Sequence, residues 1–137
     1  MGILLAIDYG QKRIGIAHTD SFQKIASGLI TLSPDKALLF IKKYVSEKVV
    51  DAIIIGQPLQ MDGNPSMIES SILKFIKKLK KELPEIMLIR FDERFTSKIA
   101  FRTLIDSGAK KNQIKNKKLI DKISATIILQ SYLESIN

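Results

Sequence analysis

The sequence contains no cysteine and only one histidine. Without cysteine, the chain can form neither a disulfide framework nor a thiolate site for metal binding or nucleophilic attack. A single histidine has no second imidazole with which to share a metal ion. We therefore interpret His18 as a strand-end or partly buried residue rather than as a metal ligand.

Long hydrophobic runs are also missing. No segment approaches the roughly 20 apolar residues that a membrane-spanning helix needs. The apolar segment 2–7 is short and ends at Asp8, so it lacks the basic start and the longer apolar stretch of a signal peptide. We expect a cytoplasmic protein that has no membrane partner.

Acidic residues are too few to balance the basic ones. The 137 residues include 22 lysines and arginines against 14 acidic residues, which gives a net charge of +8. A hydrophobic content of 45% is enough for a core, and we expect one domain over 1–137. The excess positive charge favours nucleic acid as a partner. The alternative is a lysine-rich surface that only keeps the protein soluble.

Hydrophobic patterning predicts alternating strands and helices. A leading hairpin followed by this alternation indicates an α/β fold with a mixed sheet. The expected strands cover 3–7, 13–18, 28–32, 49–55 and 86–91, and the expected helices start at 33–34 and cover 68–83, 97–105 and 119–136.

Local signals refine these boundaries. Residues 8–12 have the composition of a turn, in which Gly10 is free to take a positive φ. Ser33 and Pro34 are typical of a helix start, and 66–69 match a capping box. The segment 107–118 is rich in lysine and poor in apolar residues, so we expect a mobile loop.

Three acidic positions stand near the ends of apolar elements. Asp8 ends one strand, Asp92 and Glu93 end another, and Asp121 lies near the start of an apolar helix. In open α/β sheets, reactive groups gather beyond the carboxyl ends of the strands. Carboxylates gathered there repel one another unless a cation lies between them, and oxygen ligands suit Mg²⁺ or Mn²⁺.

Each acid also has a purely structural interpretation. Asp8 could belong to a turn, Asp92 or Glu93 could cap the following helix, and Asp121 could be a first-turn acid favoured by the helix dipole. Their joint placement favours a metal-dependent phosphodiesterase site. Arg94, beside the acids, could form bidentate bonds to phosphate.

Basic residues are candidates for contacts to the phosphate backbone. By default the lysines of 107–118 are a solvated loop, and the functional interpretation makes them an arm for phosphate. The predicted nucleic-acid-binding residues are Lys12, Arg13, Arg94, Lys110, Lys111, Lys117 and Lys118.

Four segments resemble motifs of the YqgF/RuvX family of nucleases related to Holliday junction resolvases. They occur in family order and span nearly the whole chain. Small departures are Gln11, Ser97 and Ser124, where the family more often has Thr or Ser, Thr, and Ala. None of them removes an acid. The segments are 7–17, 55–63, 92–97 and 120–125.

The resemblance implies an RNase H-like fold, with a mixed five-stranded sheet and helices on both faces. It implies a hydrolase that cleaves phosphodiesters with Mg²⁺ or Mn²⁺ and processes the 5′ end of pre-16S rRNA during ribosome biogenesis. The catalytic and metal-binding acids would be Asp8, Glu93 and Asp121. Glu93 is preferred to Asp92 by analogy with related resolvases, because the sequence does not decide between them.

Other functions remain open at this point. The resemblance also allows a resolvase of four-way DNA junctions. A non-catalytic nucleic-acid-binding domain would gain nothing from clustered acids. An actin-like ATPase has a similar Asp-x-Gly loop but needs two lobes, and this chain supplies one. The expected partner is nucleic acid, with precursor ribosomal RNA ahead of a DNA junction; we also expect ribosome association and a monomer or weak dimer.

Overall fold

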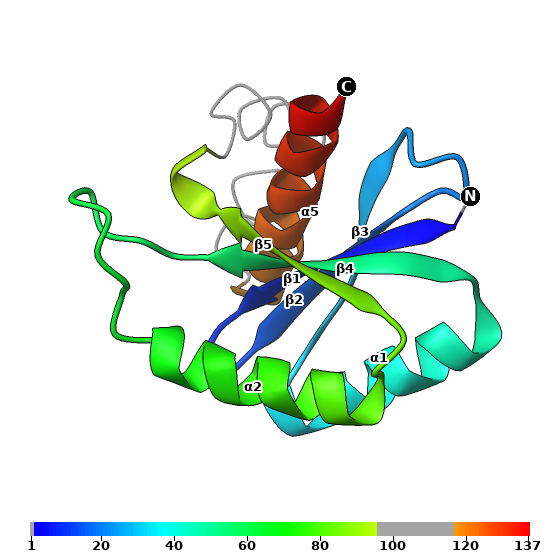
Figure 1. Ribbon diagram of the computed structural model, residues 1–137, viewed down its shortest axis with the longest axis horizontal. Coiled ribbons are helices and arrows are strands. Elements are labelled where there is room, and N and C mark those ends of the chain that lie inside the picture. The colour runs from blue at the N-terminus through cyan, green and yellow to red at the C-terminus, as the bar shows by residue number, and fades with distance from the viewer. Residues whose placement is uncertain (1, 96–116) are drawn as a thin grey trace.

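The computed structural model describes residues 2–95 and 117–137 (Figure 1). The predicted helix 97–105, most of the predicted loop 107–118, and Lys110 and Lys111 therefore lie outside the described residues. The elements in chain order are β1 (Ile3–Tyr9), β2 (Ile14–Thr19), β3 (Ala26–Leu32), α1 (Pro34–Glu47), β4 (Val50–Gln57), α2 (Glu69–Glu82), β5 (Met87–Asp92), a 3₁₀ turn (Glu93–Phe95) and α5 (Lys117–Ile136).

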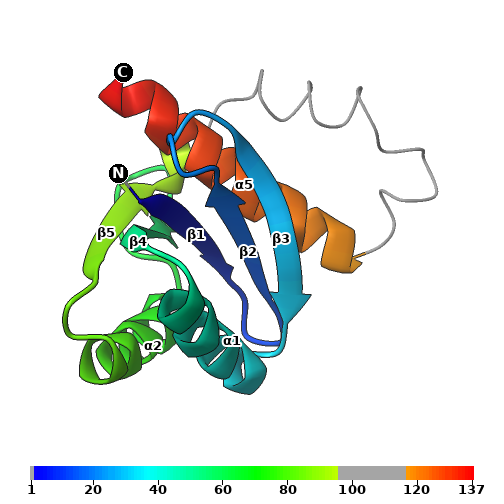
Figure 2. The same cartoon turned by 90° about the vertical axis from the view of Figure 1, so that its right-hand side faces the viewer.

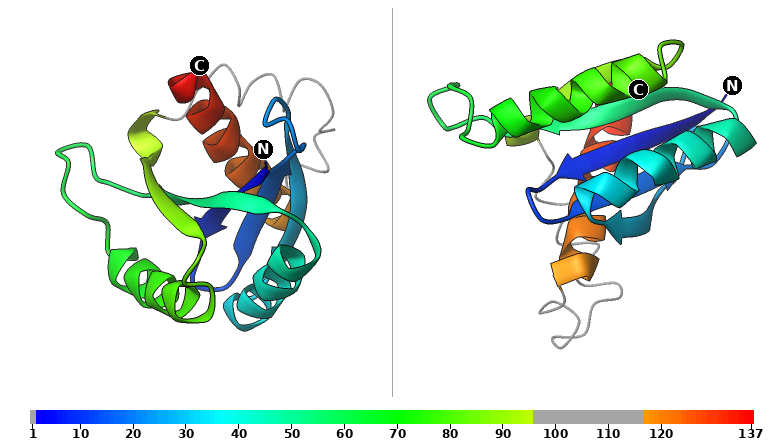
Figure 3. Two further views of the ribbon diagram at one scale, coloured as in Figure 1. Left: turned by 45° about the vertical axis from the view of Figure 1, so that its right-hand side comes forward. Right: turned by 90° about the horizontal axis from the view of Figure 1, so that it is seen from below.

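The five strands form one mixed sheet in the order β3-β2-β1-β4-β5. The first three strands are antiparallel neighbours, whereas β1, β4 and β5 run parallel to one another. Helices α1 and α2 lie side by side on one face, and α5 crosses the other (Figures 2 and 3). The predicted α/β architecture, with helices on both faces, is confirmed.

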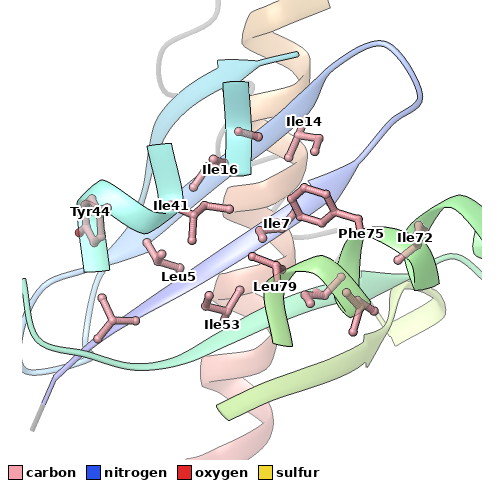
Figure 4. Close-up of a cluster of buried hydrophobic side chains, with 14 residues drawn as sticks. Leu5, Ile7, Ile14, Ile16, Ile41, Tyr44, Ile53, Ile72, Phe75 and Leu79 are labelled. Carbon is pink, nitrogen blue, oxygen red and sulfur yellow. The ribbon is translucent and has the colours of Figure 1, made fainter. Parts of the chain in front are cut away.

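The face that carries α1 and α2 is packed with large aliphatic side chains (Figure 4). Alternate residues of the central strands point to this face, as the period of two along a strand requires. They meet Ile41 of α1 and Ile72 and Leu79 of α2. The fully buried strand residues of this cluster are Leu5, Ile7, Ile14, Ile16, Ile53 and Ile55.

The face covered by α5 contains more small residues, although Leu4 and Ile54 also belong to it. Ala6, Ala17 and Ala52 point from the strands to this face, and Ala125 meets them from the helix. Small side chains let the axis of a helix come close to a sheet. The short distance matters for the site, because α5 carries Asp121.

The chain reversal between β1 and β2 differs from the predicted turn. Strand β1 continues through Tyr9, so Asp8 lies inside a strand. Gly10 does not take a positive φ; among the described glycines only Gly63 does. The Gly10 amide instead donates to the Arg13 carbonyl at 2.9 Å, and a Cβ at residue 10 would lie 2.6 Å from that oxygen. Gly10 is thus required for close approach.

Of three predicted helix starts, that of α1 is confirmed and those of α2 and α5 differ. Ser33 occupies the N-cap of α1 and Pro34 its first position, as predicted, although Ser33 makes no side-chain cap bond to the helix. The predicted capping box at 66–69 is wrong: α2 starts at Glu69 without a side-chain cap, because the Glu69 carboxylate binds Arg90 instead. Helix α5 starts at Lys117, so 117 and 118 are helical rather than part of a loop.

The structure supports a packing role for His18. It lies in β2, partly buried, and its Nδ1 is 2.8 Å from the Tyr44 hydroxyl. Burial, and to a smaller extent the charge of Lys48, lowers the pKa of His18 below its usual value.

None of the helices in the described ranges is both long and apolar enough to cross a membrane.

Candidate active site

Asp8 lies on the α5 face of the sheet, in the central strand β1. Leu4 and Ala6 point to the same face as Asp8, because alternate residues of a strand share a face. Both belong to the core beneath α5. On one side, Asp8 pairs with Gly15 of β2. On the other side, Ile7 pairs with Ile55 of β4, which places Gly56 next along that strand. A carboxylate therefore stands between two glycines.

Gly15 brings Asp121 to this position. A Cβ at residue 15 would overlap the backbone carbonyl of Asp121 and lie 3.2 Å from its Cβ. Only a glycine lets α5 lie this close to β2. Asp121 belongs to the second turn of α5, and the first turn contains no acid. The interpretation of Asp121 as a first-turn acid favoured by the helix dipole is therefore wrong.

Gly56 has the same effect for Glu93. A Cβ at residue 56 would lie 3.1 Å from the carboxyl carbon of Glu93 and 2.9 Å from Cδ1 of Ile128. The Glu93 side chain therefore lies over the end of β4, on the α5 face. Two glycines that flank the central strand thus make room for the two acids that flank Asp8.

The electrostatics of Asp8 reflect this arrangement. Burial raises the pKa of Asp8 to about 7, with further contributions from the negative charges of Glu93 and Asp121. Burial removes water that would stabilise the carboxylate, and like charges oppose its ionisation. A group with such a pKa binds either a proton or a cation readily near neutral pH.

Glu93 is held in a similar balance. Burial raises the pKa of Glu93, the positive charge of Arg90 opposes that rise, and Asp92 and Glu69 add to it. Glu93 is the first residue of the 3₁₀ turn after β5. The turn lets its side chain leave the direction of the strand and lie over Gly56.

Asp92 has a different environment. Its carboxylate accepts bonds from Nε and Nη2 of Arg94, the shortest at 2.7 Å, and from the Arg94 amide at 2.9 Å. The Arg94 guanidinium lowers the pKa of Asp92. The structure thus turns Asp92 to Arg94 and Glu93 toward Asp8; the choice of Glu93 over Asp92 as a metal ligand stays a prediction. The structure also gives Arg94, predicted to contact phosphate, an intramolecular partner.

An ion pair that the sequence did not suggest lies on the opposite face of the sheet. Arg90 of β5 donates to both carboxylate oxygens of Glu69, at 2.7 and 3.1 Å. It also donates to the carbonyl of Gly56 at 3.2 Å. Glu69 is 8% exposed. The only available signal was an arginine inside an apolar strand, and its partner could not be identified before the sheet was assembled.

Of the other predicted basic residues, the structure describes Lys12, Arg13, Lys117 and Lys118. Arg13 Nε donates to Asp121 Oδ2 at 2.7 Å, so this arginine neutralises one of the acids. Lys12 is exposed in the turn before β2, and Lys117 and Lys118 are exposed in the first turn of α5. A cavity of about 550 Å³ lies between the turn that precedes β2, Met67, Ile68 and Asp121.

The donor set fits a hard divalent cation by its chemistry. The three acids offer only carboxylate oxygens, which Mg²⁺ and Mn²⁺ prefer, and their mutual repulsion is the kind that a cation relieves. Within residues 2–95 and 117–137, however, no three acidic or histidine side chains are near enough to one another to hold one ion in this arrangement. Asp121 binds Arg13 in this structure.

The overall structure is similar to a solved structure. "T. thermophilus RuvC in complex with Holliday junction substrate" matches 100% of this chain and 98% of that chain, with a TM-score of 0.64 and 10% sequence identity. At this identity the likeness concerns the fold. The predicted RNase H-like fold is thereby confirmed.

Sequence relatives extend over almost the whole chain. A protein from Flavobacterium psychrophilum named "Putative pre-16S rRNA nuclease" is 53% identical over 130 residues, covering 95% of both chains. A relative of the same name from Phocaeicola vulgatus is 50% identical over 135 residues, covering 98% of this chain and 97% of its own. The family described as "RuvX: Holliday junction resolvase" matches residues 2–135. The chain belongs to the RuvX family.

Proposed function

We propose that this protein is a nuclease that hydrolyses phosphodiester bonds of precursor 16S ribosomal RNA, with Asp8, Glu93 and Asp121 as the acids of its active site. The observation that carries the proposal is the placement of Glu93 and Asp121 on either side of Asp8, across Gly56 and Gly15. The RNA substrate is suggested by the names of the relatives from Flavobacterium psychrophilum and Phocaeicola vulgatus.

The three carboxylates would hold divalent cations. Bound Mg²⁺ or Mn²⁺ supplies an activated water and stabilises the charge of the leaving oxygen. The pKa of Asp8 is about 7, so near neutral pH this carboxylate would bind either a proton or a cation. Asp121, whose carboxylate accepts from Arg13 in this structure, would be one of the residues that hold the ion. Arg13 would then have its guanidinium available for a phosphate oxygen, to which it can bind in bidentate fashion.

The rest of the site would position the strand to be cut. Glu93 is kept over β4 by the 3₁₀ turn, and Arg90 limits the rise of its pKa. Lys12 and Lys118 lie exposed nearby, on different elements. Their contacts would be made to phosphates, which favour binding without selecting a base sequence.

The test compares two substrates under three metal conditions. End-labelled precursor 16S RNA and a four-way DNA junction are incubated with the protein in Mg²⁺, in Mn²⁺, or in EDTA. We expect cleavage of the RNA with either metal and none in EDTA. Cleavage restricted to the junction would instead support the second candidate, a Holliday junction resolvase, which the description of the family favours. Cleavage of neither substrate would contradict both.

The control for contaminating nucleases is a variant prepared in the same way. Asp8→Asn keeps the shape of the side chain and removes its charge. Activity that is present in the wild type and lost in this variant belongs to the chain. Activity that is equal in the two preparations comes from another protein.

A further inference from the structure

A second cavity, of about 310 Å³, lies beside the acids, where four elements meet. The turn before β2, the end of β3, the start of α1 and the start of α5 all contribute to it, and Figure 2 shows the end of β3 beside the first turn of α5. We call it the basic pocket. Its polar lining consists of Lys12, Arg13, Thr31, Ser33, Lys36 and Lys118.

The charge of the basic pocket has one sign. Four of its lining residues are cationic, and no acidic residue lines it in the described part of the chain. Asp35 adjoins Lys36, but it lines a separate cavity together with Tyr9. Lys12 makes no ion pair with any residue that the structure describes. An oxyanion is the ligand that such a lining favours.

The pocket is held together by a bond between distant segments. The Thr31 hydroxyl donates to the backbone carbonyl of Lys118 at 2.6 Å, and Thr31 is only 9% exposed. This bond attaches the first turn of α5 to the end of β3. Lys118 thereby lines the same cavity as Lys36, an exposed residue of α1. The cations therefore come from fixed backbone positions, unlike lysines along one free helix surface.

The basic pocket adjoins the candidate active site. Lys12 and Arg13 line both the basic pocket and the cavity that Asp121 lines. A nucleic-acid strand with one phosphate at the acids can therefore continue past these two residues into the pocket. We propose that the basic pocket binds a phosphate of the substrate strand next to the bond that is cut; this proposal rests on the proposed nuclease function.

The proposal assigns roles to residues that the sequence did not single out. Lys36 becomes a phosphate-binding residue on α1, and Thr31 becomes a positioning residue for Lys118. Because phosphates are common to all nucleotides, the pocket contributes affinity without base preference. It also contributes to RNA and DNA equally, so the choice between them must come from elsewhere in the protein.

The test compares Lys36→Gln with Lys43→Gln. Both lysines are exposed on α1, and both changes remove one positive charge, but only Lys36 lines the pocket. Binding of a fluorescent single-stranded RNA is measured in EDTA over a series of salt concentrations. We expect Lys36→Gln to raise Kd by about threefold to tenfold at low salt and to reduce the magnitude of the salt slope by about 0.7. Lys43→Gln should change neither.

Several outcomes would overturn the pocket. Equal effects of the two variants would mean that only the net charge of the protein matters, and an unchanged Kd for Lys36→Gln would remove Lys36 from the binding surface. A loss for RNA with none for a matched single-stranded DNA would contradict recognition through phosphate. Equal thermal unfolding temperatures of the two variants show that folding is not the cause.

The binding experiment is independent of catalysis. EDTA prevents metal-dependent cleavage, so the binding assay measures affinity alone. If the wild type binds RNA through Lys36 in EDTA but does not cleave it in Mg²⁺ or Mn²⁺, the pocket proposal stands and the proposed nuclease function fails. If the wild type cleaves RNA and Lys36→Gln has the same KM and Kd, the proposed function stands and the pocket proposal fails.

Discussion

The two faces of the sheet are made from alternate residues of the same strands, yet they differ in size and polarity. The face under α1 and α2 is filled by isoleucine and leucine, whereas the face under α5 has alanine and glycine along its centre. The first face buries the larger set of aliphatic side chains, and buried apolar area stabilises the fold. Small residues on the second let α5 bring Asp121 close to the sheet and leave room over Gly56 for Glu93 from the 3₁₀ turn.

This division separates stability from chemistry. Carboxylates packed together cost free energy unless they are protonated or bind a cation. The large core on the opposite face offsets that cost without being disturbed by it. Substitutions on the α5 face should therefore act mainly on activity, and substitutions on the other face mainly on the free energy of unfolding.

The largest effect is expected from the acids themselves. Asp8→Asn, Glu93→Gln and Asp121→Asn should each lower the rate of RNA cleavage by more than about 100-fold. Loss of a residue that only supports a metal ligand already costs 10–100-fold, and these residues would be ligands. Each amide keeps the size of the side chain, so RNA affinity in EDTA should be retained or improved.

Asp92→Asn is the matched control for Glu93→Gln. Asp92 binds Arg94 rather than facing Asp8, so its loss should reduce cleavage much less. If the Asp92 variant is the inactive one, the choice between the two neighbours is wrong. Wild-type cleavage rates in all three main variants would dismiss the acids as the active site.

The second prediction concerns pH and the α5 face. The pKa of Asp8 is raised from 3.8 to about 7 in the folded protein, so the unfolded chain binds fewer protons between these values. The free energy of unfolding should therefore fall as pH rises from about 4 to 7, by up to about 4 kcal/mol from this group, less the part that solvent screens. Urea unfolding at pH 4, 6 and 8 measures this change in the free energy of unfolding.

Asp8→Asn isolates this contribution from those of other acids. Relative to the wild type, the variant should be equally stable at pH 4 and more stable at pH 8. Adding Mg²⁺ at pH 8 should raise the unfolding temperature of the wild type, because binding to the folded state stabilises it, and should leave the variant nearly unchanged. A stability difference that does not vary with pH would contradict the raised pKa.

The third prediction tests the exception on the apolar face, the pair of Arg90 and Glu69. Arg90→Met leaves the nearly buried Glu69 carboxylate without its partner, which should lower the free energy of unfolding by about 2–4 kcal/mol. The double variant Arg90→Met/Glu69→Leu should recover most of that loss, since an apolar pair suits this face. Urea unfolding of the wild type, Arg90→Met and the double variant measures these differences. A double variant as unstable as Arg90→Met would show that the ion pair itself is needed.

The sequence allowed the architecture to be predicted, because it depends on local pattern, whereas the role of the three acids stays a prediction. Short apolar runs predicted the strands, and the ends of those strands singled out Asp8, Asp92 and Glu93 as candidates. What could not be predicted depends on contacts between distant segments. Glu69 was assigned to a helix cap because it follows Ser66 by three residues, whereas its partner Arg90 is on a neighbouring strand.

The glycines illustrate the same limit. Gly10 was expected to serve a turn through positive φ, and it serves close approach instead. Gly15 and Gly56 carried no local signal, since a glycine inside a strand pattern indicates only that something comes near. That the neighbours are the backbone of Asp121 and the side chain of Glu93 became evident only when α5 and the 3₁₀ turn were placed against the sheet.

The smallest effect, and the most specific test of the comparison, is expected from glycine-to-alanine changes on the α5 face. At residue 15 a Cβ overlaps the backbone of Asp121, whereas at residue 28 it meets Lys122 Cβ and Thr126 Oγ1 at 3.3 Å. Backbone cannot move aside without moving the helix, so Gly15→Ala should lower the free energy of unfolding by about 1–3 kcal/mol. It should also reduce cleavage, because Asp121 moves with α5. Gly28→Ala should stay within about 1 kcal/mol of the wild type, since alanine is the better strand residue, and should cleave normally. If the two variants behave alike in urea unfolding and in cleavage, then the close approach at Gly15 is not what places Asp121 beside Asp8.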